Sequence, residues 1–186
     1  IPFFIKAPQI KNAPKKIDIP VTGADLFPTL LELAGIDENN NLDGKSLVPL
    51  LKRKRFKERF LYWHYPHYGN QGGDPNAIIR KGDWKLIHYF EDGKNELYNL
   101  TNDIGENEDI FNKFSDVGLE LRNELKKWLI LSDAIIPKKD PLHNYEEEKK
   151  WLFENKQKIK LKLEKNRLLQ LDPNYVPNDD WWGSED

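Results

Sequence analysis

The chain has 186 residues, of which 32% are charged, with 29 Lys and Arg against 31 Asp and Glu and a net charge of -2. This balance gives no overall attraction to nucleic acid or to an anionic membrane, so neither is expected as a partner. The chain has no cysteine, which excludes disulfides, thiolate metal sites and a cysteine nucleophile, and no apolar run approaches the roughly 18 residues of a membrane span.

The first residues predict a strand. Residues 1–5 are almost wholly apolar and too short for a helix, which is typical of a buried strand. A buried strand needs neighbouring strands, and the rest of the sequence offers few. Together with the absence of methionine, this pattern leads us to expect a piece of a longer protein whose larger sheet lies before Ile1.

Residues 25–34 are predicted to form a helix. Leu26, Leu30 and Leu33 recur at spacings of four and three, and Gly35 follows as a C-terminal stop. We expect this leucine stripe to pack on the sheet to which the first strand belongs.

The loop at residues 37–44 alternates Asp and Asn as a calcium loop does. An EF-hand loop needs glycine at its sixth position and glutamate at its twelfth, where this chain has Leu42 and Val48. The better interpretation is a solvated loop whose side chains bond their own backbone.

A first domain is predicted over residues 1–55, ending with a short helix at residues 46–51 and a basic run. The sequence of the next region, residues 56–133, predicts a four-stranded antiparallel meander followed by one helix. Ser115 is the predicted N-cap of this helix, which covers one face of the sheet. Strand composition and Gly-Asp or Asp-Gly turns place its elements at residues 59–65, 77–81, 84–90, 96–100 and 116–131.

Residues 134–186 form a tail. Residues 145–170 are rich in Lys and Glu, and Leu152, Ile159 and Leu163 fall on one helical face, which favours a helix. The last residues have no periodicity and are expected to run as an extended arm. The basic run at residues 52–55 and the Lys-rich stretch near residue 160 are most simply solvated faces.

The densest polar and aromatic cluster lies at residues 62–74. Its candidate ligand-binding side chains are two imidazoles and an amide pair: His64, His67, Asn70 and Gln71. At the end of a strand such groups can hydrogen-bond and stack on a sugar. The alternative is that the aromatic residues are a core face and the histidines cap the strand, and a metal site at the histidine pair is a weaker option.

Four blocks of sequence occur in the order and spacing of a sulfatase C-terminal half, and on them the chain resembles that family. The blocks are Asp25–Gly35, Asp43–Leu47, Ala77–Ile87, and Glu96–Leu100 with Asp103–Glu106. The resemblance covers residues 1–131, with a weaker continuation at residues 136–145.

The resemblance implies a fold class: an alkaline-phosphatase-like α/β domain, of which residues 1–55 supply the last strand and helices, followed by an antiparallel-sheet subdomain. In the family, a Cys or Ser in a Cys/Ser-x-Pro-x-Arg motif becomes formylglycine, and calcium stabilises the sulfate oxygens. This chain has no such motif. The nucleophile and the calcium ligands are therefore expected in the N-terminal part, with no catalytic or metal-binding residue in this chain.

Three functions follow as hypotheses. The first is a sulfatase acting on a sulfated carbohydrate, in which this chain contacts the N-terminal part, shapes the substrate pocket and is inactive alone. The second is a phosphate or phosphonate ester hydrolase of the same superfamily. The third is a non-catalytic glycan-binding module. A periplasmic or secreted location and a bacterial source follow from the resemblance and the Lys-, Asn- and Ile-rich composition only.

Overall fold

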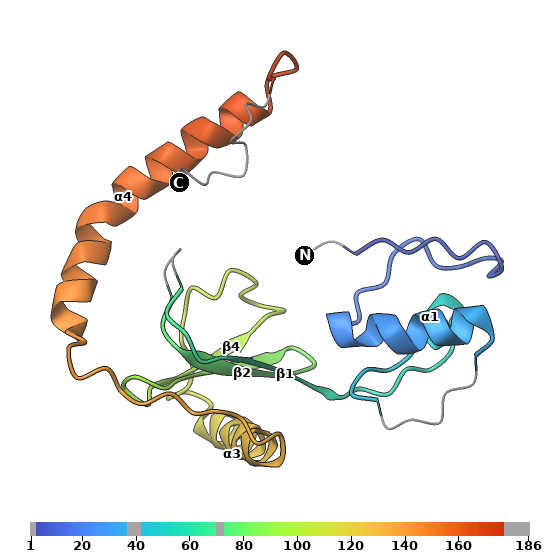
Figure 1. Cartoon of the computed structure of the whole chain (residues 1–186), viewed down its shortest axis with the longest axis horizontal. Coiled ribbons are helices and arrows are strands. Elements are labelled where there is room, and N and C mark those ends of the chain that lie inside the picture. Colours follow the sequence, from blue (N-terminus) through green and yellow to red (C-terminus); the bar gives the residue numbers. More distant parts are fainter. Residues whose placement is uncertain (1–2, 37–41, 70–72, 177–186) are drawn as a thin grey trace. The chain divides into compact units, whose positions relative to one another are not determined.

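The computed structural model describes residues 3–36, 42–69 and 73–176. It divides the chain into two compact units, Ile1–Lys139 and Asp140–Asp186. The domain boundary predicted at residue 55 lies inside the first unit and stays a prediction. The first unit contains a helical region, a four-stranded sheet and a helix across that sheet (Figure 1).

The helical region begins with a short 3-10 turn, Gly23–Asp25, that leads into α1, Leu26–Ala34. Gly35 ends α1 with a φ of 72°, in the left-handed region that glycine adopts without strain. A second short helix, α2, spans Val48–Leu51 and buries three of its four side chains. Both predicted helices are confirmed.

Two expectations about this region involve a sheet that is not among the described strands, and both stay predictions. Residues 3–5 form no strand, and Phe4 is 91% exposed, because no described strand lies beside them to hydrogen-bond with. The leucine stripe of α1 is not covered either: Leu26 and Leu30 are 41% and 61% exposed. The side of α1 that is buried instead carries Asp25 and Thr29.

The sheet is an antiparallel meander in the order β1-β2-β3-β4, as predicted. Its strands are β1 Phe60–Tyr65, β2 Asn76–Lys81, β3 Trp84–Tyr89 and β4 Asn95–Asn99. The turns after β2 and β3 carry Gly82 and Gly93 at φ values of 55° and 75°, which tight hairpin turns need. Three apolar side chains, Ile79, Leu86 and Leu97, stand opposite one another across the strands.

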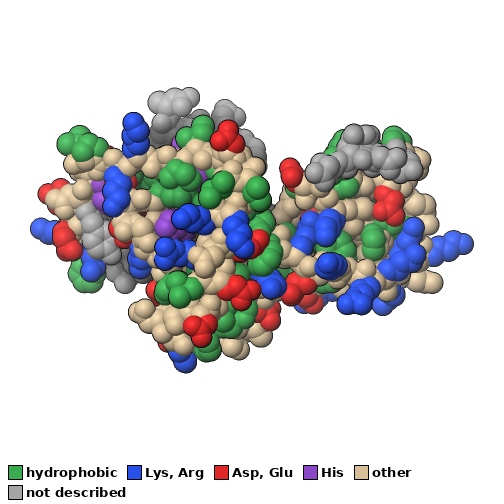
Figure 2. Space-filling model, turned by 90° about the horizontal axis from the view of Figure 1, so that it is seen from below, with side chains coloured by type: hydrophobic (Ala, Val, Ile, Leu, Met, Phe, Trp, Pro, Cys, Tyr) green, Lys and Arg blue, Asp and Glu red, His purple; other side chains and the backbone are tan. Residues whose placement is uncertain are grey.

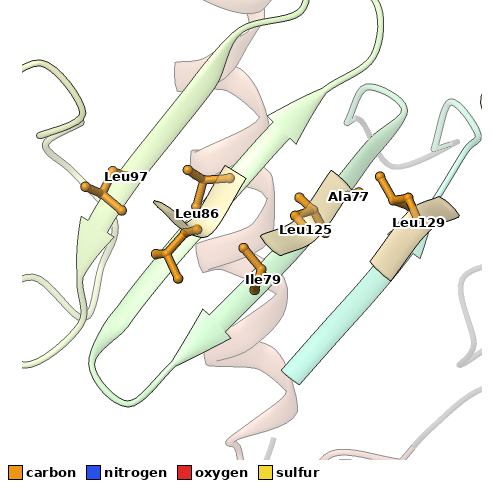
Figure 3. Packing of buried hydrophobic residues seen from close by; sticks show 7 residues of the cluster. Ala77, Ile79, Leu86, Leu97, Leu125 and Leu129 are labelled. Atoms are coloured by element: carbon orange, nitrogen blue, oxygen red, sulfur yellow. The ribbon is translucent and has the colours of Figure 1, made fainter. Parts of the chain in front are cut away.

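Helix α3, Ser115–Leu131, covers the face of the sheet that carries this row. Leu121, Leu125 and Leu129 close the core from the helix side, and Figure 3 shows the sheet and helix side chains facing one another. Tyr62 of β1 stacks on Trp128 of α3 with ring centroids 4.7 Å apart. The predicted N-cap is wrong by one residue, since Ser115 is the first helical residue and Phe114 occupies the cap without a side-chain bond.

The second unit contains α4, Tyr145–Gln170, with the bounds expected from the sequence. Asn144 caps it by accepting a hydrogen bond from the Glu147 amide at 3.3 Å. The predicted apolar stripe is not buried, since Ile159 and Leu163 are 43% and 62% exposed, and the Leu152 side chain lies outside the described ones. The described start of the expected arm is a turn rather than an extended segment.

Candidate functional site

A buried carboxylate ties the helical region to the sheet. Asp25 has no exposed surface, and its carboxylate accepts hydrogen bonds from the backbone amides of Thr22 at 2.8 Å and Lys45 at 2.9 Å. The carboxylate also forms an ion pair with the guanidinium of Arg59, which lies immediately before β1. Both side chains of this pair are nearly buried. Although burial acts to raise the pKa of Asp25, the bonds from Arg59, Lys45 and Thr22 hold it below its usual value.

Two further contacts complete this junction. The Thr29 hydroxyl donates to the Asp25 carbonyl at 2.5 Å and accepts from the Leu47 amide at 2.9 Å. Gly44 lies so close to the Ala24 carbonyl that a Cβ there would stand 1.9 Å from its oxygen. The sequence blocks around Asp25 and Gly44 therefore meet at one point, and they set the position from which β1 starts.

His64 lies on the face of β1 that α3 covers. Its Nε2 is 2.9 Å from the carbonyl oxygen of Ile135, in the segment just after α3. The imidazole lies perpendicular to the ring of Phe90, with a centroid distance of 5.4 Å. Its Nδ1 is buried with no hydrogen-bond partner among the described residues. His64 therefore holds the segment after α3 against the end of the sheet.

His67 is placed differently. It follows the end of β1, is exposed, and meets the ring of Tyr65 edge-on at 5.6 Å. Tyr65 is next to His64 in the strand, so the two side chains point to opposite faces. The structure therefore does not bring His64 and His67 together. Asn70 and Gln71, the predicted amide pair, lie outside the described residues.

The opposite face of the sheet carries a compact polar network. Glu96 accepts hydrogen bonds from the hydroxyls of Tyr89 and Tyr98, each at 2.9 Å, and from Lys94 at 2.6 Å. Burial acts to raise the pKa of Glu96, but the Lys94 bond and the two phenols lower it, while burial and Glu96 raise the pKa of both tyrosines. At neutral pH the Glu96 carboxylate is ionised and accepts hydrogen bonds from Lys94, Tyr89 and Tyr98. These bonds stabilise the edge of the sheet.

A hollow of about 560 Å³ opens between the end of β3 and the second half of α3. Its floor is apolar and includes Leu125 and Leu129, and Phe90 stands at one side. Its polar lining comes from His88, Arg122, Lys126 and Asp133. In Figure 2, which views the molecule from below, hydrophobic, basic and histidine side chains lie side by side on one face.

The sequence prediction missed this hollow. The available signals were weak: His88 and Phe90 continue the face of Leu86 at spacings of two, and Arg122 and Lys126 are one helical turn apart. Nothing in the sequence shows that the two sets of residues meet. The contact depends on how α3 crosses the sheet.

A metal site does not form from the described residues, where no three His, Cys, Asp or Glu side chains come together. The placement of His64 and His67 on different sides of the sheet explains why that pair does not form one. The loop residues 37–41 lie outside the described part. Within the described ranges, no helix is long and apolar enough to cross a membrane.

Comparison with known proteins gives one family. Residues 1–131 match the family described as "N-sulphoglucosamine sulphohydrolase, C-terminal". A sulfatase of Formosa agariphila is 34% identical over 127 residues, which cover 59% of this chain and 23% of that protein. The Delta 4,5-hexuronate-2-O-sulfatase of Bacteroides thetaiotaomicron is 32% identical over 148 residues, covering 75% of this chain and 29% of that protein.

A solved structure of a 2-O GAG sulfatase superposes with a TM-score of 0.51 at 28% identity. The match covers 63% of this chain and 27% of that one. The chain thus spans about a quarter of the length of the proteins it is similar to.

Proposed function

Because this chain belongs to the N-sulphoglucosamine sulphohydrolase C-terminal family, we propose that it is the C-terminal part of a sulfatase that hydrolyses sulfate esters of a sulfated carbohydrate. The predicted fold class, an alkaline-phosphatase-like fragment with a four-stranded antiparallel sheet packed on a helix, is confirmed. The observation that carries the proposal is the match over residues 1–131, which includes the helical region, the whole sheet and α3.

The proposal assigns the bond-breaking groups to the N-terminal part of the same protein. The described residues supply no cluster of acidic or imidazole ligands for calcium, and the chain has no formylglycine motif. Formylglycine and calcium would act from the N-terminal part, and this chain would shape the pocket around them. A periplasmic or secreted location remains part of the proposal.

The uncovered side of α1 supports an N-terminal partner. Leu26, Phe27 and Leu30 are 41%, 56% and 61% exposed, and Phe4, in the segment before α1, is almost fully exposed. Such a contiguous apolar helix face is typical of a surface that another element covers. We assign this face to contact with the N-terminal part, with Asp25 and Arg59 fixing its orientation to the sheet.

The end of β1 is the part of this chain that we assign to the substrate pocket. His67 is exposed and carries two ring nitrogens that can donate to or accept from a sugar hydroxyl. His64 would act by position, since its ring is held between Phe90 and the Ile135 carbonyl. Asn70 and Gln71 stay a prediction from the sequence.

The substrate to test first is a glycosaminoglycan disaccharide with a 2-O-sulfated unsaturated uronate, because a curated relative and a solved structure are both named for 2-O-sulfate chemistry. The experiment measures sulfate release by the full-length protein that contains these 186 residues. We expect His67→Ala to reduce kcat/KM about tenfold, equivalent to about 1.4 kcal/mol.

His143→Ala is the matched control, because His143 lies beyond residues 1–131, and it should leave the kinetics unchanged. Unchanged kinetics in His67→Ala would remove the histidine from the pocket. If the protein cleaves a phosphate or phosphonate ester but no sulfate ester, the sulfatase assignment itself is wrong.

A further inference from the structure

The hollow beside α3 has the size and lining of a small-molecule site. At about 560 Å³ it falls within the roughly 300–1,000 Å³ typical of such sites. Its floor is made of side chains that belong to the core, so it is closed from below by a rigid surface. None of its lining residues belongs to β1, whose end is the part assigned to the substrate pocket.

The charged groups at its rim favour an anion. Arg122 and Lys126 stand one helical turn apart on α3, both exposed, and neither forms an ion pair within the described part of the chain. Asp133 is the one acidic lining residue, so the lining carries two positive charges and one negative charge. Arg122 can bind a carboxylate or sulfate through two parallel hydrogen bonds, and Lys126 adds a point charge.

The remaining lining groups suit a sugar ring. Phe90 offers an aromatic ring for the apolar face of a pyranose, and the imidazoles of His64 and His88 each hold it edge-on with centroids 5.4 Å away. The Nδ1 atom of His88 lies 2.9 Å from the Asn95 side-chain oxygen and donates to it, because a carbonyl oxygen only accepts. Its Nε2 is then the nitrogen that can accept a hydrogen bond from a sugar hydroxyl.

The walls of the hollow are held in place before any ligand arrives. The Ile135 carbonyl bonds to His64, and Ala134 and Ile136 on either side of it line the hollow. The Ala134 amide also donates to the Leu129 carbonyl at 3.0 Å, which anchors the segment to the end of α3. A pre-formed wall lowers the ordering cost of binding.

We propose that this hollow is a subsite for an anionic sugar unit, a uronate or a sulfated hexosamine, of the glycan on which the enzyme acts. The inference rests on the proposed function for the identity of the glycan. Phe90 stacks on the ring, Arg122 and Lys126 bind its carboxylate or sulfate, and His88 and Asp133 accept hydrogen bonds from its hydroxyls.

The test is direct binding, which requires no turnover. Isothermal titration of the 186-residue chain with a heparin-derived disaccharide bearing a 2-O-sulfated uronate should show saturable binding that weakens as salt rises. The double variant Arg122→Gln/Lys126→Gln should weaken the affinity at least about tenfold, because it removes the two charge-assisted contacts. Its melting temperature should match the wild type, since both side chains are exposed.

Two matched variants locate the site. Lys127→Gln removes the same charge from the next position of α3 but does not line the hollow, and it should bind as the wild type does. Lys158→Gln/Lys162→Gln removes two charges from α4 and should also bind normally. The inference is overturned if the chain does not bind the disaccharide, if Arg122→Gln/Lys126→Gln binds normally, or if the α4 variant is the one that loses binding.

These outcomes are separate from those of the proposed function. Sulfate release by the full-length protein with unaltered binding in Arg122→Gln/Lys126→Gln would remove the subsite and leave the sulfatase assignment intact. Specific binding at the hollow without sulfate release would support the subsite and remove the sulfatase assignment.

Discussion

At the scale of single residues, the most consequential feature is a charge with no access to water. Asp25 is fully buried, and a buried carboxylate is tolerated only when its oxygens are hydrogen-bonded and its charge is paired. Here two backbone amides and Arg59 meet both needs. The same carboxylate closes the turn that starts α1, so one side chain serves the local structure and the contact to the sheet.

Asp25→Asn should therefore destabilise the chain by about 3 kcal/mol, because it leaves the Arg59 charge without its partner in a nearly buried site. Urea denaturation followed by circular dichroism measures the loss. Asp18→Asn is the control: Asp18 pairs with Lys16 at 2.8 Å, but both side chains are about four-fifths exposed, and the midpoint should not move. If Asp18→Asn also lost about 3 kcal/mol of stability, burial would not explain the effect of Asp25→Asn.

The pH dependence of the same variant separates charge from shape. The pKa of Asp25 is lowered in the folded chain, so its contribution is complete above the ordinary carboxyl pKa of about 3.9 and is lost as pH falls through the folded value. Asp25→Asn should thus show a shallower loss of stability below about pH 4 than the wild type. If the free energy of unfolding falls equally steeply below about pH 4 in the two proteins, the loss in Asp25→Asn comes from packing alone.

At the scale of elements, the meander and α3 follow from short-range patterns. Strands β2 to β4 contain branched and aromatic residues, and turns with glycine at positive φ lie between these strands. In α3, Leu121 and Leu125 recur at a helical spacing of four, and both are buried. Residues beyond the strand ends were harder to place, and the cap of α3 was misassigned by one position because its Phe114 makes no side-chain bond.

Leu125→Ala tests this core. Leu125 is 1% exposed and packs on the row of Ile79, Leu86 and Leu97, so we expect a loss of about 2–5 kcal/mol from the cavity and the lost apolar contact. Thermal and urea unfolding both measure it. Leu131→Ala, in the same helix but 87% exposed, should change stability by less than about 0.5 kcal/mol. Equal losses in the two variants would show that α3 does not pack as described.

At the scale of the whole molecule, the distribution of exposed apolar side chains is uneven. The α1 face with Phe27 and Leu30 is uncovered, whereas the α3 face of the sheet is closed by a full set of core residues. An uncovered apolar face of this kind fits the proposed contact with an N-terminal part of the protein.

Leu30→Glu tests this expectation in the 186-residue chain. The wild type should self-associate with rising concentration in light scattering after size exclusion, and Leu30→Glu should remain monomeric because a charge interrupts the apolar face. Leu161→Glu, at a comparably exposed position of α4, should associate as the wild type does. A wild-type chain that stays monomeric at every concentration would contradict the prediction. In the full-length protein, the same Leu30→Glu change should lower the folded yield.

The sequence alone determined the family, the approximate positions of most helices and strands, and the order of the sheet. These depend on signals within a few residues: periodicity, turn glycines and short blocks in a fixed order. The sequence placed His64 and His67 in one candidate site, whereas the His64 ring contacts Phe90 and the His67 ring contacts Tyr65.

Only the tertiary structure decided which faces are covered and which residues meet. The burial of Asp25 requires contacts from Lys45 and Arg59, 20 and 34 residues away. The hollow joins His88 of β3 to Arg122 of α3. Such meetings depend on strand register and on the way a helix crosses a sheet, and these are properties of the packed chain that no local pattern carries.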